Sequence, residues 1–210
     1  MPAVHDLTGP AGHLEALIDE PGGREPRAAV VFAHPLPTHG GTMHTKAVYQ
    51  GTKGLVRAGC AVLRFNFRGV GKSEGSFTGG EGERGDFEAA LDYMTRRYPA
   101  LNLWAAGFSF GAWIALEHGA VDPRVKVLIG IAPPVTREGY TFEHIFDSTK
   151  PKFLVQGDLD ELCPVKDLWA FYAKLREPKE IVVIDGASHL FVGKTEEVGE
   201  ALESLLGDFE

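Results

Sequence analysis

The chain has 210 residues, 44% of them hydrophobic and 24% charged, which is the balance of an ordinary soluble globular protein with a sizeable core. Its formal net charge of −8, without a cluster of Lys or Arg, argues against nucleic acid or an anionic membrane surface as a main partner. No signal peptide or transmembrane span is evident, and the two cysteines, Cys60 and Cys163, fit reduced thiols, so we expect a cytoplasmic protein.

Short apolar strands alternate with helical segments along the chain. In chain order we expect a strand at 28–33, a helix at 46–58 ended by Gly59, a strand at 60–67, a helix at 83–98 ended by Pro99, a strand at 101–107 and a helix at 110–118 closed by Gly119. Strands at 125–131 and 152–156, a helix at 168–176, a strand at 180–184 and a helix at 195–206 follow, and residues 13–18 are a candidate antiparallel edge strand. This alternation predicts an α/β fold in a single domain over residues 1–210, with a doubly wound, mostly parallel sheet covered by helices on both faces.

Two segments match G-x-S-x-G, the pattern of a serine nucleophile on a sharp turn between a strand and a helix. The first, GKSEG, lies well after its strand, and further glycines rather than a helix follow it. It also fails as a phosphate-binding loop, because Asn66 stands where that motif needs its first glycine. The second, GFSFG, has a strand before it and a helix after it. Ser109 is therefore the candidate nucleophile and Ser73 a loop residue, the alternative being a tight turn with a spectator serine at 109.

A serine hydroxyl needs a general base, and the base needs an orienting acid. Three histidines follow Ser109 in the chain. His118 lies on the helix that leads away from the serine, and His144 lies in the segment between two strands. His189 follows the last strand, at the carboxyl edge of the sheet where Ser109 also emerges, so we expect His189 to be the base.

The orienting acid is expected on the loop after the strand at 152–156, where Asp158 and Asp160 stand. Asp158 lies at the strand's end, where an aspartate often caps a turn. Asp160 is two residues further and faces the loop that carries His189. We therefore prefer Asp160 as the acid, with Asp158 as the alternative.

An acyl-transfer site also needs two backbone N–H groups that stabilise an oxyanion. Phe110 offers one at the start of its helix. Leu36 offers the other from the loop HPLPTHGG, since its neighbours Pro35 and Pro37 have no N–H.

The same region holds His34, His39 and His44, which raises the alternative of a metal site. Their five-residue spacing suits neither one helical face nor a zinc finger, and no Cys or carboxylate joins them locally. We expect neither a metal nor a cofactor.

Five stretches in chain order, HPLPTHGGTMHTKAV, LRFNFRGVGKSEGSF, GFSFGAW, GDLDELCP and GASHLF, resemble the α/β-hydrolase superfamily, in its small serine-hydrolase and esterase branch near dienelactone-hydrolase-like proteins. The resemblance spans about residues 28–192. It implies an α/β-hydrolase fold whose triad is Ser109, Asp160 and His189, with Leu36 and Phe110 as oxyanion donors.

The segment RGVGKSEG at 68–75 resembles a loop that shapes the pocket in this superfamily. The chain departs from related sequences in reading HPLP where they often have HPHP. Asn66 stands where others have Asp, which leaves the partner of Arg68 open. Its nucleophile is a serine, unlike the cysteine of dienelactone hydrolase itself.

Only residues 132–151 separate the strands at 125–131 and 152–156, which leaves room for a minimal, cap-like segment of one or two short helices. The apolar residues Tyr140, Phe142 and Phe146 in this segment either dock onto the body of the protein or form a wall of the acyl pocket.

These features together predict a serine hydrolase that cleaves small-molecule carboxylic esters of small to medium acyl groups through an acyl-enzyme. A thioesterase or small peptidase would use the same triad. A non-catalytic binding protein of the same fold would be favoured by a missing triad member, and none is missing. The oligomeric state is not indicated.

Overall fold

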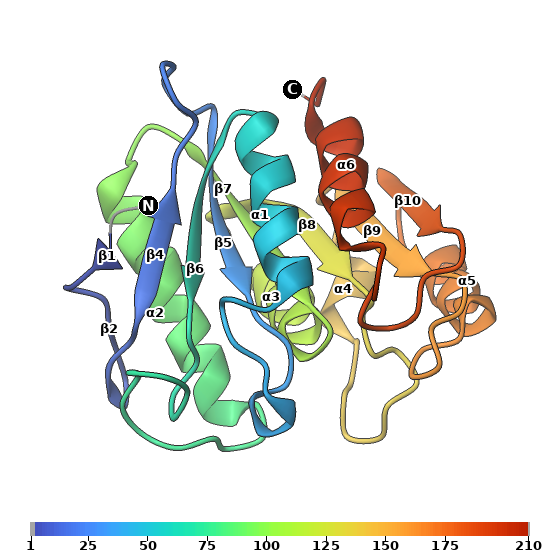
Figure 1. Cartoon of the computed structure of the whole chain (residues 1–210), viewed down its shortest axis with the longest axis horizontal. Helices are drawn as coiled ribbons and strands as arrows, with labels where there is room; N and C mark the ends of the chain where they lie inside the picture. The colour runs from blue at the N-terminus through green and yellow to red at the C-terminus, as the bar shows by residue number, and fades with distance from the viewer. Residues whose placement is uncertain (1–2, 210) are drawn as a thin grey trace.

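The computed structural model describes residues 3–209. Within this range, eight strands form one central sheet in the order β1-β4-β6-β5-β7-β8-β9-β10 (Figure 1). The strands from β6 to β10 in this order run parallel, whereas β4 and β1 are antiparallel additions at one edge. The strands are β1 Ala3–Val4, β4 Ala16–Asp19, β5 Ala28–Ala33, β6 Cys60–Phe65, β7 Asn102–Phe108, β8 Val125–Ile131, β9 Lys152–Gly157 and β10 Lys179–Ile184, with β2 Thr8–Gly9 and β3 Gly12–His13 in a small separate sheet. This confirms the predicted α/β fold with a mostly parallel sheet.

Helices cover both faces of the sheet (Figure 1), with α1 and α6 on one face and α2, α3 and α5 on the other. They are α1 Lys46–Arg57, α2 Glu81–Arg97, α3 Phe110–Val121, α4 His144–Asp147, α5 Val165–Lys174 and α6 Thr195–Leu206, with a short 3₁₀ turn at Pro37–His39. Among the described residues, none of these helices has the length and apolar composition needed to cross a membrane.

Strand β5 shows why the central strands are apolar throughout. All of its residues are buried, and they alternate between the two faces. Ala29 and Val31 belong to the hydrophobic cluster with α2 and α3, whereas Val30 and Phe32 belong to the cluster with α1 and α6. A strand between two helical layers has no face left for polar side chains.

Most expected boundaries differ from those of the structure by one to three residues, and two of these differences have a clear physical reason. Helix α3 continues through Gly119 to Val121 rather than ending at the glycine. A Cβ at Gly119 would lie 2.8 Å from the side chains of Ala105 and Leu128, so this glycine permits close packing on the sheet instead of stopping the helix. The strand expected at 13–18 is antiparallel as predicted, but it begins at Ala16 and lies one position inside the edge, because β1 pairs with it.

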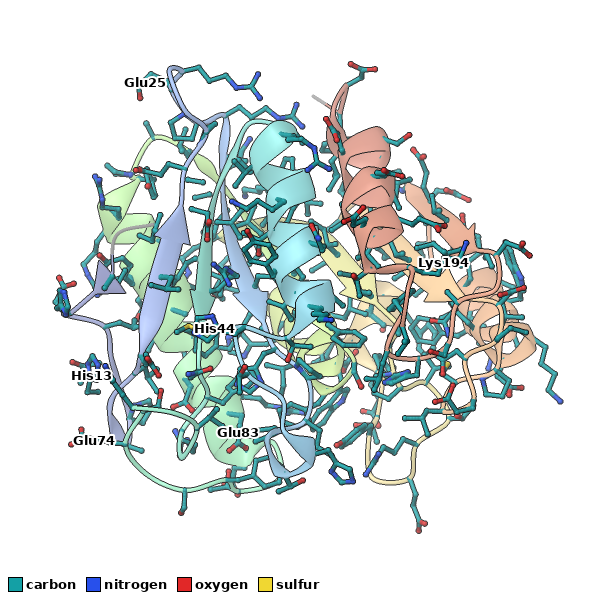
Figure 2. The ribbon with its side chains drawn as sticks, in the orientation of Figure 1. His13, Glu25, His44, Glu74, Glu83 and Lys194 are labelled. Atoms are coloured by element: carbon teal, nitrogen blue, oxygen red, sulfur yellow. The ribbon has the colours of Figure 1, made fainter. Side chains whose placement is uncertain are left out.

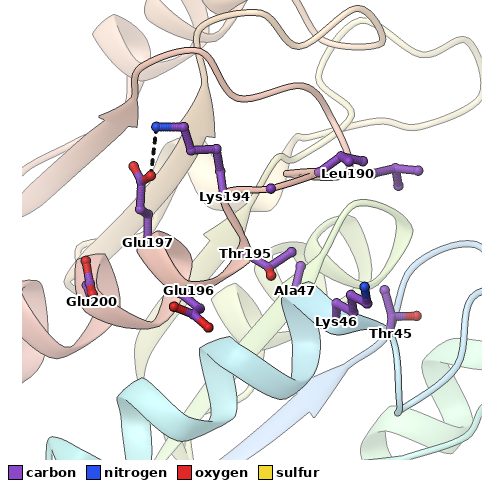
Figure 3. Close-up of a pocket in the computed structure, with 11 residues that line it drawn as sticks. Thr45, Lys46, Ala47, Leu190, Lys194, Thr195, Glu196, Glu197 and Glu200 are labelled. Carbon is purple, nitrogen blue, oxygen red and sulfur yellow. Dashed lines mark ion pairs between the residues drawn. The ribbon is translucent and has the colours of Figure 1, made fainter.

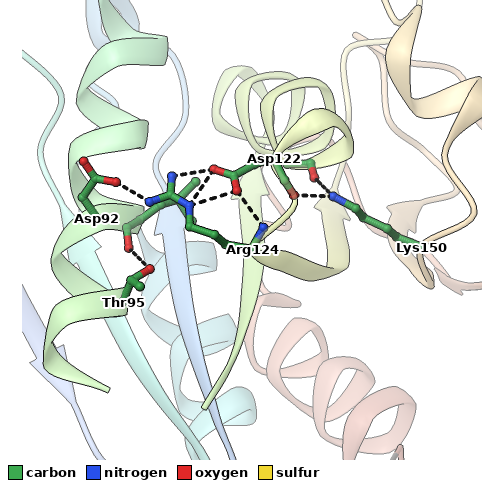
Figure 4. Close-up of polar contacts among 7 residues, drawn as sticks. Asp92, Thr95, Asp122, Arg124 and Lys150 are labelled. Atoms are coloured by element: carbon green, nitrogen blue, oxygen red, sulfur yellow. Dashed lines mark hydrogen bonds and ion pairs between the residues drawn. The ribbon is translucent and has the colours of Figure 1, made fainter. Parts of the chain in front are cut away.

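A polar network holds the C-terminal end of α3 (Figure 4). The guanidinium of Arg124 donates to both carboxylate oxygens of Asp122 and to Asp92 on α2. The ammonium of Lys150 donates to the main-chain oxygens of Gly119, at 2.7 Å, and Asp122, at 2.5 Å. Lys150 lies at the end of segment 132–151, so this network ties the end of the segment to α3.

The middle of segment 132–151 is tied to the same helix by Glu117. This buried carboxylate accepts the backbone N–H groups of Glu143, His144 and Ile145 at 3.0, 3.1 and 3.1 Å, at the start of α4. A carboxylate at a helix N-terminus satisfies donors that have no partner within the helix. Helix α3 therefore fixes the position of a segment that lies far from it in sequence.

Replacing Glu117 by Ala should loosen this segment. Three N–H groups lose their acceptor, so we expect the free energy of unfolding to fall by about 1–3 kcal/mol. We also expect cleavage within residues 132–151 to become faster in limited proteolysis followed by mass spectrometry. The control is Glu138→Ala, an exposed glutamate in the same segment. Equal cleavage rates in the two variants would contradict the anchoring role.

Candidate active site

Ser109 occupies a sharp turn between β7 and α3. Its backbone has φ 53° and ψ −118°, a conformation that L-residues rarely adopt. A Cβ at Gly107 would lie 2.1 Å from the carbonyl oxygen of Gly111, and a Cβ at Gly111 would lie 2.3 Å from that of Ala33. The glycines of GFSFG are thus required by close backbone approaches. The motif builds a strained turn that presents the serine at the carboxyl edge of the sheet.

His189 lies on the loop after β10, as predicted, and is buried. Its Nε2 atom lies 2.9 Å from Ser109 Oγ, and its Nδ1 atom lies 2.8 Å from Asp160 Oδ2. The loop is anchored by Phe191, a buried residue with φ 52° whose ring packs against Phe108. Three residues that are far apart in sequence therefore form one continuous chain of hydrogen bonds.

The Asp160 carboxylate has partners on both oxygens. Oδ1 accepts the backbone N–H groups of Leu162 and Cys163, each at 2.8 Å. Oδ2 faces His189 Nδ1 and also accepts a hydrogen bond from Gln156 Nε2 at 2.9 Å. Because a carboxylate only accepts, this contact places the imidazole hydrogen on Nδ1 and turns the lone pair of Nε2 toward Ser109.

Asp158, the alternative acid, takes a different position. Its backbone N–H bonds to Ile184 O at 3.2 Å, which joins the turn to the end of β10. His189 has its hydrogen bonds to Asp160, Ser109 and Glu161 instead. The geometry brings Asp160, and not Asp158, to the imidazole.

The loop with Leu36 is braced by His34. The buried ring of His34 donates from Nδ1 to Pro35 O at 2.6 Å and accepts the N–H of Phe67 at Nε2, at 3.0 Å. Burial lowers the pKa of His34 to about 4, so this ring is neutral near pH 7. Gly111 touches the carbonyl oxygens of Ala33 and His34, so the loop lies directly against the start of α3. His34 is thereby a structural brace.

Leu36 and Phe110 are both close to this junction. Leu36 precedes the 3₁₀ turn, and its carbonyl oxygen accepts the N–H groups of His39 and Gly41. Phe110 is the first residue of α3, so its N–H has no acceptor within the helix. Within residues 3–209 no group of three or more His, Cys, Asp or Glu side chains has an arrangement that could hold a metal ion.

The segment at 68–75 supports the loops around the site. Ser73 is buried, donates to Asn66 O at 2.7 Å and accepts the N–H of Glu15 at 3.0 Å. Arg68 pairs through two nitrogens with Asp86 on α2, at 2.9 and 2.7 Å, which answers the question of its partner. Residue 66 is not that partner.

Two glutamates make contacts at the end of this segment and just beyond it (Figure 2). Glu74 accepts the N–H of His13 at 2.6 Å. Glu83 is buried and accepts the N–H groups of Thr78 and Gly80 at 3.0 and 2.6 Å. These contacts tie residues 74–80 to the backbone at His13 and to the start of α2.

The aromatic residues of segment 132–151 separate into two groups. Tyr140 stacks on Trp113 with ring centroids 4.5 Å apart and lies 6.0 Å from the ring of Phe110, the residue after Ser109. Phe142 and Phe146 pack instead on Phe171 of α5. All three line a cavity of about 270 Å³ to which neither Ser109 nor His189 contributes. Tyr140 is thus the member of the three whose ring contacts the residue next to Ser109.

Sequence reasoning missed two aromatic residues near the serine. Phe77 lies 5.7 Å and Trp113 5.8 Å from the ring of Phe110, both as centroid distances. Phe77 lies in a glycine-rich loop with no periodicity that could indicate it. Trp113 lies one helical turn after Ser109, a spacing that could have identified it.

Exposed apolar side chains lie close in sequence to the acid and the histidine. They are Leu159, Leu162, Leu190 and Val192, which are 55–77% exposed. A second cavity, of about 780 Å³, lies between the starts of α1 and α6 (Figure 3). Its lining includes Leu190, the residue after His189. Its lining is Thr45, Lys46, Ala47, Leu190, Val192, Gly193, Lys194, Thr195, Glu196, Glu197 and Glu200. This cavity, to which Ser109, Asp160 and His189 do not contribute, combines apolar groups with charged ones, including the Lys194–Glu197 ion pair.

Comparison with known proteins places this arrangement in a family. The family model described as serine aminopeptidase, S33 matches residues 24–149. An α/β serine hydrolase homologue from Coxiella burnetii is 40% identical, with a TM-score of 0.90, over 98% of this chain and 97% of that one. An α/β serine hydrolase from Xanthomonas campestris, described as having no lid, is 35% identical, with a TM-score of 0.87, over 97% of this chain and 92% of that one.

An uncharacterised protein of Rickettsia prowazekii is 37% identical over 214 residues, covering 98% of this chain and 89% of the relative. The family match spans more than half of the chain, and these relatives extend the likeness over almost all of it. The chain therefore belongs to the serine aminopeptidase, S33 family of α/β serine hydrolases.

Proposed function

We propose that the protein hydrolyses carboxylic esters of small to medium acyl groups, with Ser109 as nucleophile, His189 as general base and Asp160 as the residue that orients the base. The observation that carries this proposal is the hydrogen-bond chain from Ser109 Oγ through the His189 imidazole to Asp160, with links of 2.9 and 2.8 Å. Donor and acceptor roles along this chain are those that an acyl transfer requires.

In the proposed reaction, His189 Nε2 takes the hydroxyl proton as Ser109 Oγ attacks the ester carbonyl carbon. The carbonyl oxygen becomes an oxyanion, for which we assign the backbone N–H groups of Phe110 and Leu36 as donors. The positive end of α3 favours the same negative charge. The C–O bond to the alcohol then breaks, and the alcohol leaves with the proton from Nε2.

The second half of the reaction releases the acid. Water attacks the acyl-serine ester, and His189 accepts one of the water protons. The tetrahedral intermediate collapses, Ser109 Oγ regains a proton from Nε2, and the carboxylic acid departs. Asp160 keeps Nδ1 protonated throughout, so Nε2 is always the atom that exchanges protons with the serine, the alcohol and the water.

The limit on acyl size rests on segment 132–151, which we propose acts as a minimal cap. Its helix, α4, spans only His144–Asp147, and the segment is held down on α3 by Glu117. Phe142 and Phe146 pack on α5, so Tyr140, which lies beside Phe110, is the residue of this segment that we propose as a wall of the acyl pocket. The lidless description of the Xanthomonas relative supports an open site.

A peptidase activity is the second candidate, because the family model is described as that of serine aminopeptidases. The same triad would cleave an amide by the same steps. Hydrolysis of amino-acid p-nitroanilides, measured beside p-nitrophenyl esters, separates the two candidates by their ratio of kcat/KM.

Labelling with a fluorophosphonate should modify Ser109, because the phosphorus reagent is attacked only by an activated serine. The adduct is located by peptide mass spectrometry. Ser109→Ala should abolish labelling and lower kcat for p-nitrophenyl butanoate by about 10³-fold or more. Ser76→Ala, a change at an exposed serine, serves as the control. An adduct on Ser73, or no adduct on the wild type, would overturn the assignment.

Asparagine substitutions at Asp160 and Asp158 should differ in effect. Asp160→Asn turns an acceptor-only group into one that can also donate, so the imidazole loses its enforced tautomer, and kcat should fall by about 10²–10⁴-fold. Asp158→Asn should keep kcat within about threefold. Steady-state kinetics over a range of pH measures both, with activity rising as His189 loses its proton. A larger loss for Asp158→Asn would mean that the wrong carboxylate has been chosen.

A series of p-nitrophenyl esters from acetate to palmitate should show its highest kcat/KM at short chains such as butanoate. Each buried methylene favours binding by about 0.8 kcal/mol, but a short wall has room for only a few of them. A maximum at dodecanoate or beyond, or activation by emulsified triglyceride, would rule out the open, minimally capped site.

A further inference from the structure

Gln156 is a fully buried amide beside the proposed acid, and the reaction scheme above does not use it. It lies on β9, directly before Gly157, in the central layer of the protein. Its Nε2 atom donates to Asp160 Oδ2 at 2.9 Å and to the carbonyl oxygen of Cys163 at 2.7 Å. Both acceptors belong to the turn that carries the acid.

The orientation of this amide is set by its neighbours. Rotating it by 180° would place Oε1 against a carboxylate oxygen and a carbonyl oxygen, which are all acceptors. The observed orientation leaves Oε1 buried without a hydrogen-bond partner among the described residues. A buried, unpaired acceptor is unfavourable. An apolar side chain would remove this unpaired acceptor but would leave Cys163 O without the donor that it has here, so the amide has a structural contact at Cys163 O and a second contact at Asp160 Oδ2.

We infer that Gln156 is a positioning residue that holds Asp160 Oδ2 toward His189, an inference that rests on the function proposed above. Oδ1 is fixed by two backbone N–H groups, whereas Oδ2 meets only Gln156 and His189 among its hydrogen-bond partners. Without the amide, the contact to Nδ1 is the one hydrogen bond left on Oδ2 among those of the described residues. The imidazole then loses a fixed partner as its charge changes during each turnover.

The amide also acts on the electrostatics of the pair. The positive end of its N–H dipole points at Oδ2 and offsets part of the negative potential that the carboxylate exerts on His189. Removing the amide leaves the imidazole beside a less compensated carboxylate, which favours the protonated, inactive ring. The ascending limb of the pH–rate profile should therefore move to higher pH.

Other titratable groups lie near the acid. Glu161 accepts the backbone N–H of His189 at 3.2 Å, and Asp158, which lies on the same turn as the acid, interacts electrostatically with Lys194. Asp167 on α5 acts, together with Asp160, on the pKa of the buried Cys163 thiol. All of these groups are unchanged in a Gln156 variant, so a shift of the limb is assigned to the amide.

The test uses Gln156→Met and Gln156→Leu, two apolar variants that differ in packing, with Gln50→Met as the matched control at the other glutamine of the chain. With p-nitrophenyl butanoate we expect kcat to fall about 10-fold or more and KM to stay within about twofold. We expect the ascending limb to move to higher pH and the fold to be retained in thermal unfolding. The control should match the wild type in all of these measurements.

Unchanged kcat and an unmoved limb in folded Gln156 variants would overturn the inference. Loss of folding in both variants would also overturn it, since the amide would then serve stability. These results are separate from failure of the proposed function, in which wild-type Ser109 would show neither fluorophosphonate labelling nor ester hydrolysis.

Discussion

Backbone atoms meet backbone atoms without intervening side chains at the turn between β7 and α3, and the rest of the site depends on this approach. Gly107 lies against Gly111 O, and Gly111 lies against the carbonyl oxygens of Ala33 and His34. One contact bends the chain sharply at Ser109. The other brings the loop with Leu36 beside the start of α3. A side chain at either glycine would separate the serine from the backbone groups that we assign to the oxyanion.

Strained backbone conformations are concentrated at this edge of the sheet, and packing and hydrogen bonds hold them in place. The three non-glycine residues with positive φ in the described range are Ser109, Ala132 and Phe191, each located just after a strand or beside the histidine. Such conformations cost about 1–3 kcal/mol each. The buried ring of Phe191 and the strand-end bonds Ser109 N to Ile131 O and Ala132 N to Val155 O hold them in place. Helix α3 and its C-cap also fix segment 132–151, because Glu117 accepts a hydrogen bond from the start of α4 and Asp122 O accepts one from Lys150.

The elements that could be predicted from the sequence were those whose signal is local. The apolar runs of β5 and β8 gave bounds that agree with the structure. Gly119 misled because one glycine can either end a helix or admit close packing, and only the position of Ala105 on β7 decides between them. Strand β1 has two residues and no pattern of its own.

In the candidate site, too, the residues with a local sequence signal could be predicted and the contacts between distant residues could not. The contexts of Ser109 and His189 are local motifs, so the sequence predicted where both residues lie. The pairing of Arg68 with Asp86 joins a loop to a helix, and nothing in the spacing of the two residues indicates it. Gln156 was missed because a single glutamine at the end of a strand matches no motif. Its contact with Asp160 depends on the path of the turn between them.

The most direct test of the account is to look for the acyl-enzyme. Acid quenching during turnover of p-nitrophenyl butanoate, followed by digestion and mass spectrometry, detects any acyl group still attached to the protein. We predict one butanoyl group on the peptide that contains Ser109, accumulating when deacylation is slower than acylation and absent from Ser109→Ala. Turnover with the butanoyl group on another residue, or undiminished turnover by Ser109→Ala, would contradict the central claim.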